Sequence, residues 1–146
     1  MIRKAKVGDV AALVNLLCQN REDDSAEARS CILREFEACI GHNERSLYLA
    51  ADEDGACLGY ILVHWIPFPM IRGHEGYISD LRVLEGRRGG GLGSQLVSMV
   101  ETEARERGCC RLILNNPKIN ESYQRAFYKK REFAERDNFA NFVKAL

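Results

Sequence analysis

A glycine-rich stretch, "RRGGGLGSQL" at residues 87–96, has the composition of a loop that binds an anion. Two arginines precede four glycines, and glycine is costly to order, so a chain seldom groups it without need. The stretch joins an apolar strand pattern ending near Leu84 to an amphipathic helical pattern beginning near Gly91. The first N–H groups of a helix are unpaired and carry partial positive charge. We therefore predict a phosphate-binding cradle.

Two common phosphate-binding loops do not fit this stretch. A Walker A loop needs Gly-Lys-Ser/Thr, but Gly93 is followed by Ser94 and Gln95. A dinucleotide-binding loop needs a third glycine where Ser94 stands, and an acidic residue in the next strand, which "CCRLILN" lacks. An NAD-binding protein remains a weaker alternative, which titration with nicotinamide cofactors would test.

The segment from Tyr77 to Phe133 resembles the GNAT superfamily of N-acetyltransferases. "YISDLRVLEGRRGGGLGSQL" is similar to the acetyl-CoA motif of its small-amine and polyamine acetyltransferases, and "FY" at 127–128 stands in the expected later helix. The order of the expected elements agrees with that superfamily over essentially the whole chain. The resemblance implies an acyltransferase that uses acetyl-CoA as co-substrate and needs no metal.

The resemblance also assigns roles to residues of the cofactor site. The strands at 78–84 and 109–115 should splay apart, so that the pantetheine arm pairs with the backbone of Leu81 and Val83, and a backbone N–H near Leu81 holds the thioester carbonyl. The pyrophosphate would lie on the N–H groups of 89–94, and Arg88 occupies the family's Arg/Gln position. The predicted cofactor-binding residues are Leu81, Arg82, Val83, Arg88, Gly89, Gly90, Gly91, Leu92, Gly93, Ser94 and Asn120.

The last part of the motif departs from the family. Asn120 stands eight residues before Tyr128, one more than is usual. Glu132 replaces the glycine that the family places before the residue equivalent to Phe133. These differences weaken the assignment of Asn120 as a cofactor contact more than that of Tyr128.

Acetyl transfer to an amine needs a proton acceptor, an oxyanion site and a proton donor for the thiolate. Tyr128 is the family's donor position. Strand alternation places Glu75, Tyr77, Ser79 and Leu81 on one face, where Glu75 is the only carboxylate, so Glu75 is our candidate base, acting through water. Asp80 has the opposite parity and would bind the amine only if the strand bulges. His64 and His74 are further candidates for the base.

The elements that must position these residues indicate a mixed α/β (α+β) fold in one domain, residues 1–146. Apolar periodicity and turn residues predict one central, mostly antiparallel sheet of about seven strands with four flanking helices, its fourth and fifth strands splayed. Asp9 and Gly41 are expected at helix ends, and 52–55 as a hairpin turn. The expected strands span 2–6, 46–52, 56–65, 76–84, 109–115, 133–137 and 141–146, and the helices span 7–20, 26–41, 93–108 and 119–131.

The amino-acid composition excludes some classes of binding partner. Lys plus Arg equals Asp plus Glu at 21 each, which argues against nucleic acid, and no apolar run is long enough for a membrane span. The N-terminus has no apolar signal core, so we expect a cytoplasmic protein. The six cysteines show no C-x-x-C spacing and are expected to be free thiols, mostly buried. An apolar last strand is compatible with a homodimer.

The sequence therefore predicts transfer of an acetyl group from acetyl-CoA to a primary amine by direct attack in a ternary complex. The acceptor would be a small molecule or a protein amino group. An acidic run at 22–24 could steer a cation, and Trp65, Phe68 and Met70 could form an apolar wall. The alternative is a non-catalytic acyl-CoA-binding module of the same fold, which would bind acetyl-CoA without releasing CoA.

Overall fold

The computed structural model describes residues 1–19, 21–52 and 54–146. The chain forms two compact units, Met1–Leu114 and Asn115–Leu146, and each is described by itself. Within the described residues, no helix is long and apolar enough to cross a membrane, and no group of three or more His, Cys, Asp or Glu side chains is placed to hold a metal ion.

The first unit is built on one five-stranded sheet in the order β1-β2-β3-β4-β5. Neighbouring strands are antiparallel except β4 and β5, which are parallel, so the mostly antiparallel expectation agrees with the observed pairing. The expectation of about seven strands is not met among the described residues. The strands are β1 (Ile2–Lys4), β2 (Arg45–Ala51), β3 (Cys57–Phe68), β4 (Gly73–Val83) and β5 (Cys109–Leu114).

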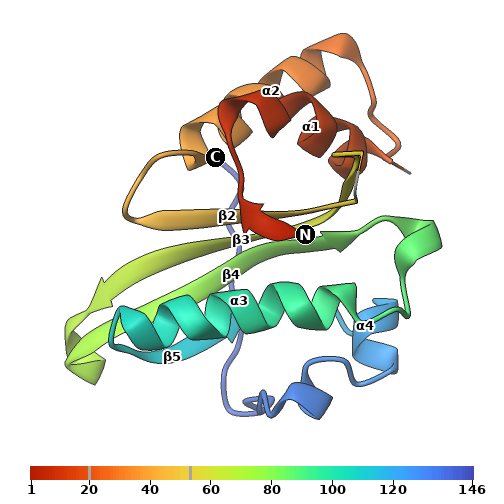
Figure 1. Ribbon diagram of the computed structural model, residues 1–146. Helices are drawn as coiled ribbons and strands as arrows, with labels where there is room; N and C mark the ends of the chain where they lie inside the picture. The colour runs from red at the N-terminus through yellow and green to blue at the C-terminus, as the bar shows by residue number, and fades with distance from the viewer. Residues whose placement is uncertain (20, 53) are drawn as a thin grey trace. The chain divides into compact units, whose positions relative to one another are not determined.

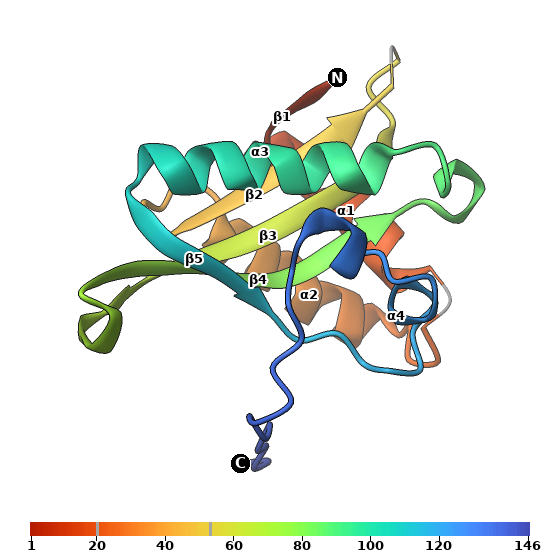
Figure 2. The same ribbon diagram turned by 90° about the horizontal axis from the view of Figure 1, so that it is seen from below.

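Helices cover both faces of this sheet. Figure 1 shows α1 (Val10–Cys18) and α2 (Ala26–Cys39) on one side and α3 (Leu92–Glu106) on the other. Figure 2 shows α3 running across the neighbouring strands. We call the two sides of the sheet the α1–α2 face and the α3 face. Strand alternation assigns every sheet side chain to one of them.

Each face has its own apolar core. On the α1–α2 face, Leu13 of α1 and Phe36 of α2 cluster with Leu47, Leu49 and Tyr60 of the sheet. On the α3 face, the helix buries Leu96, Val97 and Val100 completely. Burying one such side chain contributes about 1.5–3 kcal/mol. These contacts fix where the ends of β4 and α3 lie.

Helix ends follow the sequence in part. Ser25 Oγ accepts a hydrogen bond from Ala28 N at 3.2 Å and caps α2. Gly41 follows α2 with a φ of +81°, as expected of a helix stop. Asp9 makes no side-chain cap for α1, because its carboxylate pairs with Arg3 at 2.6 Å instead.

Two predicted features include residues outside the described ranges. The helix expected over 7–20 includes Asn20, and the hairpin turn expected over 52–55 includes Glu53. Around the turn, Gly55 has a φ of +85°, and Asp52 Oδ1 accepts a hydrogen bond from Ala56 N at 2.8 Å. These contacts are typical of an Asp-Gly turn.

The second unit differs from the single helix predicted over 119–131. The helix α4 spans only Glu121–Gln124, because Ala126 adopts a left-handed conformation with a φ of +55°. A 3-10 turn follows at Lys129–Arg131. The strands expected over 133–137 and 141–146 are absent from the described residues, where Phe142 and Val143 are almost fully exposed. A strand pattern needs a pairing partner, which sequence periodicity cannot supply.

Candidate active site

The glycine loop has a backbone that only glycine adopts easily. Gly89 and Gly91 have φ values of +83° and +82°, and Gly91 is the residue immediately before α3. Gly90 lies outside the left-handed region, and a Cβ atom added there would meet nothing closer than the Arg87 carbonyl oxygen at 3.9 Å. Two glycines are thus required by the turn itself, whereas Gly90 leaves open space on the loop surface.

The first turn of α3 offers its N–H groups beside this loop. No side chain caps the helix at Gly91. Leu92, Gly93 and Ser94 form its first turn, and Arg88 is exposed with its Nε 3.3 Å from the Val83 carbonyl oxygen. Unpaired N–H groups at the start of a helix attract anions. The residues present therefore fit the pyrophosphate of acetyl-CoA.

The strand β4 continues past its partner β5. Their pairing runs from His74 opposite Cys109 to Ile78 opposite Leu114, whereas β4 continues through Val83. The predicted cofactor residues Leu81, Arg82 and Val83 lie on this continuation. Among the described residues, no strand pairs with β4 on this side beyond Ile78, where the family resemblance places the pantetheine arm.

A β-bulge changes which side chains share a face of β4. Ile78 lies opposite Val63 and Asp80 lies opposite Leu62, so Ser79 is the extra residue. Leu81 lies opposite Ile61 and faces α3, so it does not share the face of Glu75. Asp80, opposite Leu62, does share the face of Glu75, so the expectation that Glu75 is the only carboxylate on that face is wrong.

The bulge places Asp80 on the α1–α2 face. The Tyr60 hydroxyl donates a hydrogen bond to Asp80 Oδ2, and Arg82 Nε lies 3.5 Å from the same oxygen. Burial, followed by the charge of Asp80, raises the pKa of Tyr60, so the phenol stays protonated and keeps donating. Asp80 is thus a fixed carboxylate at the bulge.

Asp80 lines a pocket between the sheet and the two helices that cover this face. Its volume is about 250 Å³. The wall is mainly apolar, but Glu35 of α2 and Asp80 of β4 each contribute a carboxylate. The lining residues are Leu17, Cys31, Ile32, Glu35, Phe36, Cys39, Leu62 and Asp80. Such a pocket suits an alkyl chain that carries positive charge.

Glu75 lies on the same face but is already paired. Arg111 of β5 places its Nε and Nη2 atoms 2.8 Å from Glu75 Oε2. Glu75 is 7% exposed, and the Arg111 guanidinium lies over the Phe68 ring at 5.5 Å. These contacts tie β4 to β5 where the two strands still pair.

An apolar wall was expected from Trp65, Phe68 and Met70. In the structure, Trp65 is buried and Met70 is 85% exposed.

Tyr128 and Asn120 belong to the second unit. The Tyr128 ring packs between Phe127 and Phe133, with centroids 4.9 and 5.7 Å away. Asn120 precedes α4, and its carbonyl oxygen accepts a hydrogen bond from Tyr123 N at 3.0 Å. Glu132 has a φ of +66°, so the position where the family has glycine is left-handed in this chain too.

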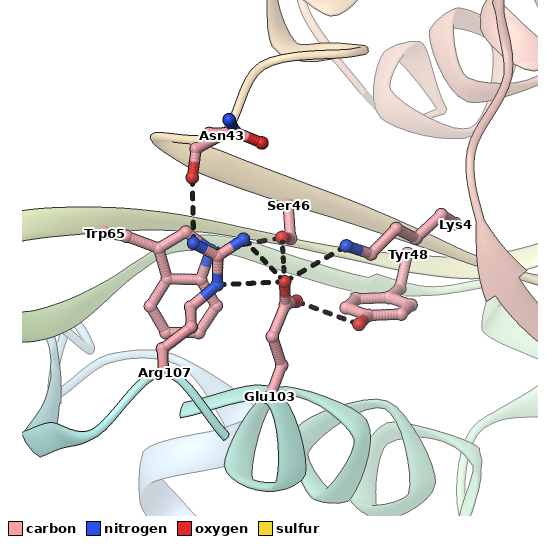
Figure 3. Close-up of polar contacts among 7 residues, drawn as sticks. All are labelled: Lys4, Asn43, Ser46, Tyr48, Trp65, Glu103 and Arg107. Carbon is pink, nitrogen blue, oxygen red and sulfur yellow. Dashed lines mark hydrogen bonds and ion pairs between the residues drawn. The ribbon is translucent and has the colours of Figure 1, made fainter. Parts of the chain in front are cut away.

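Sequence reasoning missed a buried polar cluster at the C-terminal end of α3. An amphipathic helix keeps its charges away from its buried side, but Glu103 lies three residues after the buried Val100 and is itself 7% exposed. The i, i+3 spacing from Val100 was the available signal. Figure 3 shows side chains from β1, β2 and the end of α3 converging on this one carboxylate.

The Glu103 carboxylate accepts several hydrogen bonds. Its Oε1 atom is 2.9 Å from Ser46 Oγ, 3.0 Å from Lys4 Nζ and 2.8 Å from Arg107 Nη2, and Oε2 is 2.8 Å from the Tyr48 hydroxyl. Burial alone would raise the pKa of Glu103, but these hydrogen bonds outweigh it and lower the pKa. The cluster anchors α3 to the sheet.

The cysteines make no disulfides. All six are free thiols, as expected, but only Cys18 is buried, whereas Cys31 and Cys110 are exposed. The expectation that they are mostly buried is therefore wrong.

The site thus combines an anion cradle at the start of α3, a free strand edge and an acidic pocket, all arranged along β4. The sequence profile of the acetyltransferase (GNAT) family matches residues 11–133. The chain belongs to this family and is an acetyltransferase, and acetyltransferases of this family use acetyl-CoA as co-substrate.

Individual relatives agree with this class. A thialysine N-epsilon-acetyltransferase from Bos taurus is 27% identical over 123 residues, covering 78% of this chain and 72% of that protein. A ribosomal-protein-alanine N-acetyltransferase from Brucella melitensis has a TM-score of 0.76 at 18% identity, covering 100% and 98% of the two chains. Glucosamine-6-phosphate N-acetyltransferase from Arabidopsis thaliana has a TM-score of 0.78 at 22% identity, covering 98% and 97%. The two solved structures show the fold alone.

Proposed function

We propose that this chain transfers the acetyl group of acetyl-CoA to a primary amine of a small cationic molecule. The observation that carries the proposal is the pocket on the α1–α2 face, whose apolar wall holds the Glu35 and Asp80 carboxylates. The thialysine acetyltransferase similarity supports an amine on an alkyl chain that bears a second charge.

The pocket lies beside the part of β4 proposed to hold the thioester. Asp80 is fixed by Tyr60 and directly precedes Leu81, whose N–H is our candidate for the oxyanion site. An ammonium group bound by Asp80 would therefore be held next to the carbonyl that it must attack. The glycine loop and the first turn of α3 would hold the pyrophosphate at the far end of the same strand segment.

Two proton transfers complete the reaction. We assign the donor to the departing thiolate to Tyr128 on the family resemblance. Glu75 was the candidate base, but its Oε2 atom already accepts two short contacts from Arg111.

The test is an acceptor screen that measures CoA thiol release. The panel contains thialysine, an alkyl diamine, glucosamine 6-phosphate and a peptide with N-terminal alanine. We expect thialysine and the diamine to be preferred, because the two carboxylates attract a second positive charge and repel phosphate. Preference for the sugar phosphate or the peptide would contradict the assigned acceptor class. Binding of acetyl-CoA without thiol release from any amine would instead support the non-catalytic alternative.

Two variants test the pocket itself. Asp80→Asn and Glu35→Gln should each raise KM for the diamine, by about tenfold if a charged hydrogen bond of roughly 1.5 kcal/mol is lost. Glu37→Gln is the matched control, because Glu37 is an exposed residue of the same helix and does not line the pocket. If Asp80→Asn and Glu35→Gln give the same KM for the diamine as Glu37→Gln, the pocket is not part of the acceptor site.

A further inference from the structure

A histidine and a serine lie together beside the bulge of β4 and the proposed acceptor site. His64 of β3 lies opposite Tyr77 of β4, and its Nε2 atom is 2.9 Å from Ser79 Oγ. Ser79 is the extra residue of the bulge and directly precedes Asp80. Ser79 shares the α1–α2 face with Tyr77 and His64, and the bulge places Asp80 on that face beside it.

The carboxylates of this face are already engaged. Asp80 accepts the Tyr60 hydroxyl, and Glu75 is paired with Arg111. These contacts hold both carboxylates in place, with Asp80 beside the proposed acceptor site. A neutral imidazole can accept a proton at a ring nitrogen and titrates near neutral pH.

The surroundings of His64 favour that neutral form. Partial burial, followed by the positive charge of Arg45, lowers the pKa of His64. The charged and titratable groups around it are Arg45 from β2, Glu44 before β2, and Tyr77, Glu75 and Asp80 from β4. In the tautomer that carries its proton on Nδ1, Nε2 of His64 accepts a hydrogen bond from the Ser79 hydroxyl.

An open hollow that His64 lines connects it with solvent. Its volume is about 430 Å³, and it is distinct from the pocket that Asp80 lines. The lining residues are Glu44, Arg45, His64, Trp65, Ile66 and Tyr77. A proton that reaches His64 can therefore leave to water, and Arg45 opposes its retention.

We infer that Ser79 and His64 form the path by which the acceptor amine loses a proton to solvent. The inference rests on the proposed acetyl transfer. Two protons leave an ammonium group when it becomes an amide, one with the CoA thiol and one along this path. The acceptor N–H bond breaks as an O–H bond forms on Ser79, whose own proton moves to His64 Nε2. The imidazolium then releases a proton to the water of the hollow.

His64 acts through Ser79 and is thus a positioning residue, so the pH profile is the decisive readout. In the unaltered chain, kcat/KM for the diamine should rise with pH through the pKa of His64, which lies below its usual range. His64→Gln should remove this acidic limb and lower the plateau by about 10²-fold, the lower end of general acid–base contributions. His42→Gln, which changes an exposed histidine after α2, is the matched control and should leave limb and plateau unchanged.

A second variant moves the His64 pKa without touching the path. Arg45→Gln removes the charge that opposes the imidazolium, so the His64 pKa measured by NMR in the free chain should rise. The acidic limb of kcat/KM should move to higher pH by the same amount. Thermal unfolding and acetyl-CoA titration confirm that each variant is folded and binds the co-substrate.

The outcomes separate the two proposals. A limb that follows the His64 pKa in Arg45→Gln and disappears in His64→Gln supports the path. An active chain whose limb stays in place in both variants overturns the path and leaves the proposed function intact. A wild-type chain that releases no CoA with any amine of the panel overturns the proposed function, and the path with it.

Discussion

Gly90→Val should weaken acetyl-CoA binding without destabilising the folded chain. The free protein does not need glycine at this position, because the backbone is not left-handed and a Cβ atom would have its nearest neighbour at 3.9 Å. Any requirement for glycine at residue 90 must therefore come from a ligand that lies against the loop. This separates the phosphate cradle from a simple connecting turn.

The magnitude follows from the contacts at risk. A side chain at residue 90 would hold the pyrophosphate away from one or two N–H groups, and a hydrogen bond to a charged group contributes about 1.5–3 kcal/mol. The dissociation constant for acetyl-CoA should rise by at least about tenfold, since 1.4 kcal/mol corresponds to a factor of ten. The unfolding free energy should stay within about 0.5 kcal/mol, as for other surface substitutions.

Titration calorimetry and chemical denaturation measure the two quantities on the same variant. Gly8→Val is the control, because a Cβ atom added at Gly8 would also meet open space and this residue lies far from the loop in sequence. Gly91→Val, in contrast to Gly90→Val, should lower the unfolding free energy by about 1–2 kcal/mol, because it forces a β-branched residue into a left-handed conformation. Unchanged acetyl-CoA affinity in folded Gly90→Val would refute the cradle.

Two further predictions concern Glu103 and Tyr128. Glu103→Gln should cost about 1–3 kcal/mol of stability at pH 7, because it removes the charge that the buried Ser46 and Tyr48 hydroxyls and the half-buried Arg107 share. The folded-state pKa of Glu103 is lowered, so its carboxylate stabilises the chain above the unfolded pKa and loses this effect as pH falls through the folded pKa. The denaturation midpoints of wild type and Glu103→Gln should therefore converge in acid. A difference between the midpoints that stays constant with pH would contradict this. Tyr128→Phe should lower kcat by about 10²-fold with little change in acetyl-CoA affinity, and full activity would assign Tyr128 to packing with Phe127 and Phe133.

Local signals in the sequence predicted the features that depend on local backbone geometry. The glycine loop and the helix after it were expected because glycine spacing and helical periodicity are properties of short segments. The left-handed backbone at Glu132 was not predicted, because the sequence showed only that the family's glycine is replaced there. The six free thiols and the mostly antiparallel pairing of the sheet also agree with expectation, whereas the parallel pairing of β4 with β5 was not predicted.

Features that depend on a distant partner were missed. The bulge at Ser79 arises from the register between β3 and β4, and it moves Asp80 to the face that simple alternation gave to Glu75 alone. Glu35 reaches the same pocket from a helix far away in sequence. Helix periodicity over 119–131 did not reveal the left-handed Ala126 that ends α4. Each of these depends on tertiary packing that overrides a local pattern.

The most direct test of the central claim is mass spectrometry of the acceptor after incubation of the chain with isotope-labelled acetyl-CoA and an alkyl diamine. The account predicts that the labelled acetyl group appears on a diamine nitrogen, and that Asp80→Asn lowers this product at limiting diamine. A chain that binds acetyl-CoA at the glycine loop but leaves the diamine unlabelled would contradict it.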